Sequence, residues 1–242
     1  MSLQPVDPGV WMRRAAIIVL DGLGIGPAHD TAAYGDEGSD TLGNALRSAG
    51  SALGLGNCAP LPGIPRVEAP TCAWGTAQPR SQGKDSTTGH WELCGLQLET
   101  PFPTYPDGFP DEVIADFSRR TGRGVLANKA ASGTAVLDEY GEEHQRTGQW
   151  IVYTSADSVF QVAAHEETIP VAELYVACAA AREMLVGEHG VSRVIARPFL
   201  GAPGAWKRTE RRKDFSVVPP GDTLLDVLER ASIPRVGVGK VD

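Results

Sequence analysis

Residues 171–196, VAELYVACAAAREMLVGEHGVSRVIA, combine the two patterns from which we infer the fold. In the first half, apolar side chains recur at the spacing of one helix face, namely at Val171, Leu174, Cys178, Ala181 and Leu185. A short run rich in β-branched residues, 193–196, follows and is typical of a buried strand. A helix that leads into a buried strand predicts an α/β or α+β unit.

The flanking sequence continues the alternation of helices and strands in both directions. We expect helices at residues 111–120 and 134–140 and strands at 125–127, 150–154 and 160–164. Further on, Asp222 is expected to cap a helix through Leu224, Leu225 and Leu228, and 235–238 is expected to be a strand. Prolines at 101, 103, 106 and 110 mark an irregular crossing segment, so we place a domain boundary near residue 100.

Near the N-terminus, the apolar run 13–21 predicts another buried parallel strand, which ends at Asp21. Ligands of open α/β sheets lie at the carboxyl ends of strands, and a carboxylate there suits Mg²⁺ or Mn²⁺. The alternative is that Asp21 only accepts hydrogen bonds in a turn. Glycines 22, 24 and 26 could suggest a dinucleotide site, but Pro27 follows them and no apolar helix begins there, which argues against that interpretation.

Composition excludes several classes of function. The 242 residues are 42% hydrophobic, which is enough for a core, and no apolar run approaches the length of a membrane helix. A formal net charge of -8 argues against nucleic acid as a partner. We therefore expect a cytoplasmic globular protein. The basic run 207–213 fits either a solvated loop or a phosphate clamp.

The hydroxyl-rich stretch 83–93, GKDSTTGHWEL, is predicted to be a loop that carries a nucleophile. Ser86 would need a general base or a metal ion to attack phosphorus. Lys84 and His90 could neutralise phosphoryl oxygens, and Asp85 could order the loop. An ordinary turn stabilised by Asp or Ser is the alternative.

Two further groups could bind a sugar phosphate. Residues 153–158, YTSADS, place hydroxyls and a carboxylate at the end of a predicted strand, where they could hold sugar hydroxyls. Cations that could bind a phosphate are Arg193, Arg197, Arg208 and Lys240. For each group, surface salt bridges are the alternative.

Taken together, these motifs resemble the phosphopentomutase family of the alkaline phosphatase superfamily. The resemblance runs nearly end to end. The stretches that carry it are 20–26, 38–43, 83–96, 100–102, 108–110, 128–133, 151–158, 163–167 and 193–199. It implies an α/β fold, with an alkaline-phosphatase-like parallel-sheet core at 1–100 and 219–242 and an inserted α/β cap domain at 101–218.

The resemblance also implies an activity and a set of site residues. The activity is interconversion of (2-deoxy)ribose 1-phosphate and 5-phosphate through a phosphorylated enzyme. Ser86 takes the place of the phosphoryl acceptor, where the family commonly has Thr. Asp21 and Ser86 correspond to ligands of two Mn²⁺ ions. The positions around the sugar phosphate are Ser155, Asp157, Arg193, Ile195, Arg208 and Lys240.

One departure from the family pattern is large. The family continues beyond position 242 with further metal ligands, so the chain resembles a phosphopentomutase without its C-terminal third. We therefore expect that the 242-residue chain does not bind both Mn²⁺ ions and is inactive by itself. The alternatives are a non-catalytic sugar-phosphate-binding relative, or another metal-dependent phosphatase or mutase of the superfamily.

Overall fold

The computed structural model describes residues 15–19, 31–35, 37–38, 55–58, 65–70, 73, 75–83 and 85–238. The chain divides into two compact units, Met1–Ala77 and Gln78–Asp242. In the first unit the described elements are the 3-10 helix η1 (Thr31–Tyr34) and the short helix α2 (Leu55–Cys58). The side chain of Asn57 both donates to and accepts from the backbone of Val67, at 2.9 Å each.

The strand predicted at 13–21 is not formed by its described residues, 15–19. They have no strand partner, and the side chain of Ile18 is 82% exposed. A strand is stable only when neighbouring strands pair with its backbone and cover its side chains. None of the described residues does this for 15–19. The rest of the run, Asp21 included, lies outside the described residues.

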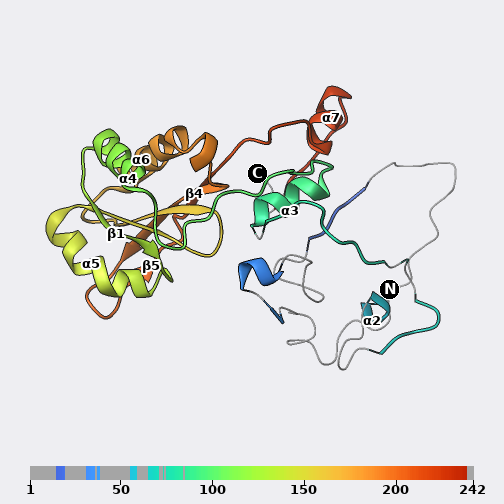
Figure 1. Ribbon diagram of the computed structural model, residues 1–242, viewed down its shortest axis with the longest axis horizontal. Helices are drawn as coiled ribbons and strands as arrows, with labels where there is room; N and C mark the ends of the chain where they lie inside the picture. Colours follow the sequence, from blue (N-terminus) through green and yellow to red (C-terminus); the bar gives the residue numbers. More distant parts are fainter. Residues whose placement is uncertain are drawn as a thin grey trace. The chain divides into compact units, whose positions relative to one another are not determined.

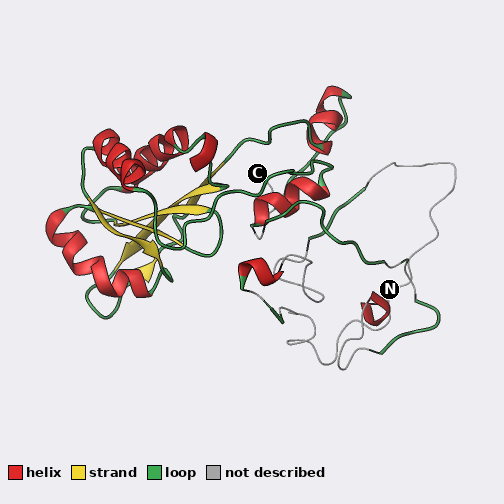
Figure 2. Cartoon of the chain, viewed as in Figure 1, coloured by secondary structure: helices red, strands yellow, loops and turns green. Residues whose placement is uncertain are grey.

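The second unit is built around a six-stranded sheet with helices on both faces (Figure 2). Its strands are β1 (Val125–Ala130), β2 (Trp150–Thr154), β3 (Val159–His165), β4 (Arg193–Leu200), β5 (Lys207–Arg208) and β6 (Lys213–Ser216). The order is β1-β2-β3-β4-β5, and β6 pairs with β4. The pairs β1–β2 and β3–β4 are parallel, whereas β2–β3, β4–β5 and β4–β6 are antiparallel. The α/β prediction is confirmed for this unit, with a mixed sheet.

Two separate cores hold the helices to this sheet. Helices α4 (Asp111–Thr121) and α6 (Val171–Met184) lie on one face, and α5 (Ala135–Thr147) lies on the other (Figure 1). The larger core joins α4 and α6 to the sheet and contains Phe117, Trp150 and Phe160, all fully buried. The rings of Phe117 and Phe160 meet edge to face at 5.2 Å. Burying each such side chain contributes about 1.5–3 kcal/mol.

The predicted helices and strands between residues 111 and 200 are all present. Trp150–Thr154 has the predicted bounds, and α5 is longer than expected, since it continues to Thr147. Both α4 and α5 end at glycines with left-handed backbones, Gly122 and Gly148. The 3-10 helix η2 (Gly187–His189) connects α6 to β4.

Residues 86–93 form helix α3 (Ser86–Leu93), so the prediction of a loop was wrong for them. Asp85 is the N-cap of this helix, and its carboxylate accepts from the backbone N–H of Thr88 at 3.0 Å and from its hydroxyl at 2.8 Å. Asp and Ser/Thr are disfavoured inside helices, but at a helix start they satisfy the free N–H groups. The same residues that suggest a turn therefore begin a helix.

The segment after the sheet also differs from prediction. Helix α7 (Leu224–Arg230) is present, but Thr223 is its N-cap, in a capping box with Asp226. Asp222 instead pairs with Arg230. Residues 235–238 were predicted as a strand and form none, and Val236 and Val238 are 88% and 84% exposed. None of the described residues offers these residues a strand to pair with.

No helix in the described ranges is long and apolar enough to cross a membrane.

Candidate functional site

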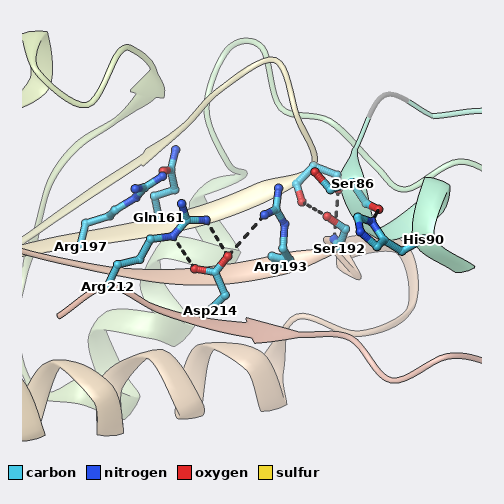
Figure 3. Close-up of polar contacts among 9 residues, drawn as sticks. Ser86, His90, Gln161, Ser192, Arg193, Arg197, Arg212 and Asp214 are labelled. Atoms are coloured by element: carbon cyan, nitrogen blue, oxygen red, sulfur yellow. Dashed lines mark hydrogen bonds and ion pairs between the residues drawn. The ribbon is translucent and has the colours of Figure 1, made fainter. Parts of the chain in front are cut away.

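Polar side chains gather on the part of the sheet that α5 does not cover. Helix α5 contacts β1, β2 and β3, whereas α6 covers β3, β4 and β6 from the opposite face. Alternation along β4 places Arg193, Ile195, Arg197 and Phe199 on the α5 side of the sheet. The ladder pairs Ile195 with Gln161 of β3 and with Asp214 of β6, so these share that side. Figure 3 shows the resulting row of polar groups.

Asp214 connects two of the arginines. It accepts from Arg212 through both carboxylate oxygens, at 2.6 Å each, and from Nη1 of Arg193 at 3.3 Å (Figure 3). The hydrogen bonds that Arg212 donates to Asp214 raise the pKa of Arg212. Nε of Arg193 is buried and has no hydrogen-bond partner among the described residues. An unpaired buried donor is costly, so Arg193 is suited to a ligand that supplies an acceptor.

Arg197 lies beside neutral partners. Its Nε donates to Oε1 of Gln161 at 3.1 Å. Burial lowers the pKa of Arg197; Tyr153 and Asp214 oppose that effect, whereas the charges of Arg212 and Arg208 add to it. Arginine nevertheless stays protonated in proteins, so Arg197, Arg208 and Arg212 together concentrate positive charge at this place.

The hydroxyl of Tyr153 lies among these arginines. Burial raises the pKa of Tyr153, and the charges of Arg197, Arg208 and Arg212 oppose that effect only in part. Tyr153 is therefore a neutral phenol that can donate a hydrogen bond. The backbone of Gly133 lies close to both Tyr153 and Arg208. A Cβ on Gly133 would be 2.9 Å from the Tyr153 hydroxyl and 3.1 Å from Nη1 of Arg208.

The structure brings several of the predicted sugar-phosphate residues to one edge of the sheet. Ser155 and Asp157 lie in the β2–β3 turn, where the Asp157 N–H donates to the Ser155 hydroxyl at 3.4 Å. Val159, two residues later, pairs with Arg193. The side chain of Ile195 is only 2% exposed, so it lies beneath the polar row. Lys240 and Lys84 lie outside the described residues.

Ser86 is the first residue of α3 and is exposed. None of the described residues hydrogen-bonds its hydroxyl, whereas Asp85 and Thr88 are occupied with each other. Nδ1 of His90 contacts the backbone oxygen of Ser86 at 2.6 Å (Figure 3). A negative group on the Ser86 oxygen would lie at the positive end of the helix dipole. Asp85 is a cap here and not a free base.

The described residues do not fit a pair of Mn²⁺ ions. Among them, no three His, Cys, Asp or Glu side chains are close enough to hold a metal ion. A serine hydroxyl alone is a poor ligand, since such ions need several oxygen or nitrogen donors. Asp21 lies outside the described part of the chain, and its role as a ligand stays a prediction.

Sequence reasoning missed Gln161 and Asp214 as site residues. Gln161 lies in an apolar strand opposite Ile195, and its hydrogen bond with Arg197 depends on how β3 pairs with β4. Arg212 was noted only as part of a basic run. The spacing of Arg193 and Arg197 in one strand was a usable signal, because residues four apart share a face of a strand.

Curated proteins named phosphopentomutase match this chain over nearly all of its length. The protein from Dictyoglomus thermophilum is 54% identical over 238 residues, which cover 96% of this chain and 61% of that protein. The proteins from Carboxydothermus hydrogenoformans and Clostridium novyi are 53% and 50% identical, with 61% of each covered. The chain is a relative of the phosphopentomutases. The resemblance found in the sequence is confirmed.

The similarity to phosphopentomutases includes the candidate site. An alignment that covers 96% of the chain omits only residues near its ends, so Ser86 and the polar row of the sheet lie within it. The chain spans about 61% of the length of these phosphopentomutases. No protein-family model matches the chain.

Proposed function

We propose that this chain carries the phosphoryl-accepting serine and the sugar-phosphate-binding domain of a phosphopentomutase. The reaction is the interconversion of (2-deoxy)ribose 1-phosphate and (2-deoxy)ribose 5-phosphate. The observation that carries the proposal is the 54% identity to a curated phosphopentomutase across 96% of the chain. The exposed Ser86 at a helix start and the arginines of β4 support it.

In this proposal Ser86 carries the phosphoryl group between the two sugar positions. The free hydroxyl of the sugar monophosphate attacks phosphorus of phosphorylated Ser86, and the bond from phosphorus to the serine oxygen breaks. The serine oxygen then attacks the other phosphate of the resulting bisphosphate and takes that phosphoryl group. The proton of the first hydroxyl ends on the oxygen that is released, so atoms balance. The free N–H groups of α3 would stabilise the phosphorylated serine.

Residues 101–218 are proposed to be an inserted cap on a core made of 1–100 and 219–242. The segments that flank this insertion meet, which supports the proposal. The Leu224 N–H donates to the Cys94 oxygen at 2.7 Å, and a Cβ at Gly221 would lie 3.3 Å from the side chain of Leu96. Helices α3 and α7 accordingly lie next to each other in Figure 1. An alkaline-phosphatase-like core is part of the same proposal.

The ligands in the cap are proposed to be those that the resemblance implies. Ser155 and Asp157 would bind sugar hydroxyls, and Arg193 and Arg208 would bind phosphate. Ile195 and Lys240 would complete the site. Two Mn²⁺ ions, with Asp21 and Ser86 among their ligands, are the expected cofactors. Because the described residues do not fit two metal ions, we assign no step to them.

Binding and turnover measured on the 242-residue chain test the proposal. Calorimetry should show that ribose 5-phosphate and its 2-deoxy analogue bind more tightly than 3-phosphoglycerate, a ligand suited to another mutase of the superfamily. Equal or weaker binding of the pentose phosphates would contradict the proposed substrate. We expect no turnover with Mn²⁺, and robust turnover would contradict an incomplete metal site. Binding without turnover is also what a non-catalytic relative would show, so a longer version of the protein must then be assayed.

A further inference from the structure

We propose that Arg197, together with Arg208 and the Tyr153 hydroxyl, forms a phosphate-binding pocket on the α5 side of the sheet. This inference rests on the proposed function and adds Arg197 and Tyr153 to the residues that the family resemblance implies. The ligand class is a phosphate monoester dianion, the group that a pentose phosphate would present.

The contacts of Arg197 leave it free to bind an anion. Gln161 accepts from its Nε at 3.1 Å and so orients the guanidinium without neutralising it. Figure 3 shows Arg197 beside Gln161 and apart from Asp214, and another side-chain neighbour of Arg197 is the hydroxyl of Tyr153. A planar guanidinium held at Nε can present two parallel N–H donors to phosphate oxygens.

The balance of charge on this face favours a ligand with more than one negative charge. Asp214 is the carboxylate on this face, among the described residues, that pairs with arginine, and it pairs with both Arg193 and Arg212. Arg197 and Arg208 are in no ion pair among those residues. Like charges held close together repel, and an anion bound between them removes that repulsion.

The backbone of the neighbouring loop packs closely against two members of the proposed pocket. A Cβ at Gly133 would be 2.9 Å from the Tyr153 hydroxyl and 3.1 Å from Nη1 of Arg208, so a side chain there would displace one or both groups. The neutral Tyr153 hydroxyl adds a donor that phosphate can accept from. Arg193, the first residue of β4, would bind phosphate as proposed above, and Asp157 would remain for the sugar. The pocket thus gives a role to a buried phenol that the proposed chemistry does not otherwise use.

Titrations with inorganic phosphate, ribose 5-phosphate and ribose test this inference. The variants are Arg197→Gln, Arg197→Lys and the control Arg211→Gln, whose arginine is exposed and pairs with Glu166. Arg197→Gln should weaken phosphate and ribose 5-phosphate about tenfold or more, as expected for a lost charged hydrogen bond. Arg197→Lys should lose less, and Arg211→Gln should change affinity less than about twofold. Ribose should bind no more weakly to the variants than to the wild type.

The outcomes separate this inference from the proposed function. If Arg197→Gln binds ribose 5-phosphate as tightly as the wild type, the pocket is refuted while a pentose phosphate function stands. If phosphate binding depends on Arg197 but pentose phosphates are not preferred, the pocket stands and the function fails. Should Arg197→Gln not fold, the ¹⁵Nε resonance of Arg197 in the wild type decides. It must shift on adding inorganic phosphate, and an unchanged resonance refutes the pocket.

Discussion

The imidazole of His144 accepts a hydrogen bond at Nε2 from the backbone N–H of His165, at 2.8 Å. Its Nδ1 lies 2.5 Å from the backbone oxygen of Gln149, so Nδ1 must carry the proton and donate. His144 is fully buried, and both ring nitrogens are thus engaged in the neutral form. Burial lowers the pKa of His144, and the nearby His165 adds to that effect.

This arrangement predicts a loss of stability in mild acid. The unfolded histidine takes up a proton near its ordinary pKa of about 6.5, while the folded one resists protonation. The contribution of His144 to the free energy of unfolding is therefore fully present above about pH 6.5. It is lost as the pH drops below that value toward the lowered pKa of the folded state. Urea unfolding at about pH 7.5 and 5.5 measures the difference, in a range above most carboxyl pKa values. His144→Gln should be less stable at both values and show a smaller difference between them. An equal difference in the variant and the wild type would contradict the assignment.

Replacing Gly108 with alanine is predicted to lower the free energy of unfolding by more than its backbone angle alone would explain. Its φ is +93°, and an added Cβ would be 2.2 Å from the backbone oxygen of Asn128. Gly122 is a matched control, since its φ is +68° and a Cβ there meets nothing within 4 Å. Gly122→Ala should cost about 1–2 kcal/mol from the left-handed backbone alone. Gly108→Ala should cost clearly more in chemical unfolding, and equal costs would show that the contact with Asn128 relaxes freely.

Asp85 is predicted to stabilise α3 and not to act as a base. Asp85→Ala should cost about 1 kcal/mol, and Asp85→Asn should restore most of it, because asparagine caps nearly as well. Hydrogen exchange at the Thr88 amide, which donates to Asp85, reports the change directly. Protection that stays unchanged in Asp85→Ala would argue against the cap.

The sequence was sufficient to predict the helices and strands whose apolar faces pack against each other within one unit. Apolar periodicity located α4, β2 and α6 because those segments bury their apolar faces within the same unit. The apolar periodicity did not reveal the order of the strands, since the three antiparallel pairings that involve β3 and β4 depend on tertiary packing.

The failures follow from the same physics. The runs 13–21 and 235–238 read as buried strands, yet their described residues are exposed and find no strand partner. Strand propensity describes a side chain that fits a covered sheet, and it cannot supply the neighbouring strand. The site was predicted in part by family resemblance. The contacts of Gln161 and Asp214 follow from the sheet register, which no local pattern reveals.

Calorimetric titration of ribose 5-phosphate into the wild-type chain, Arg193→Gln and Arg119→Gln tests the central claim most directly. Arg193 has a buried, unpaired Nε at the sheet edge, whereas Arg119 is exposed on α4 and pairs with Asp116. The account predicts that the wild type and Arg119→Gln bind alike and that Arg193→Gln binds about tenfold more weakly or worse. Failure of the wild type to bind ribose 5-phosphate, or equal binding by Arg193→Gln, would contradict it.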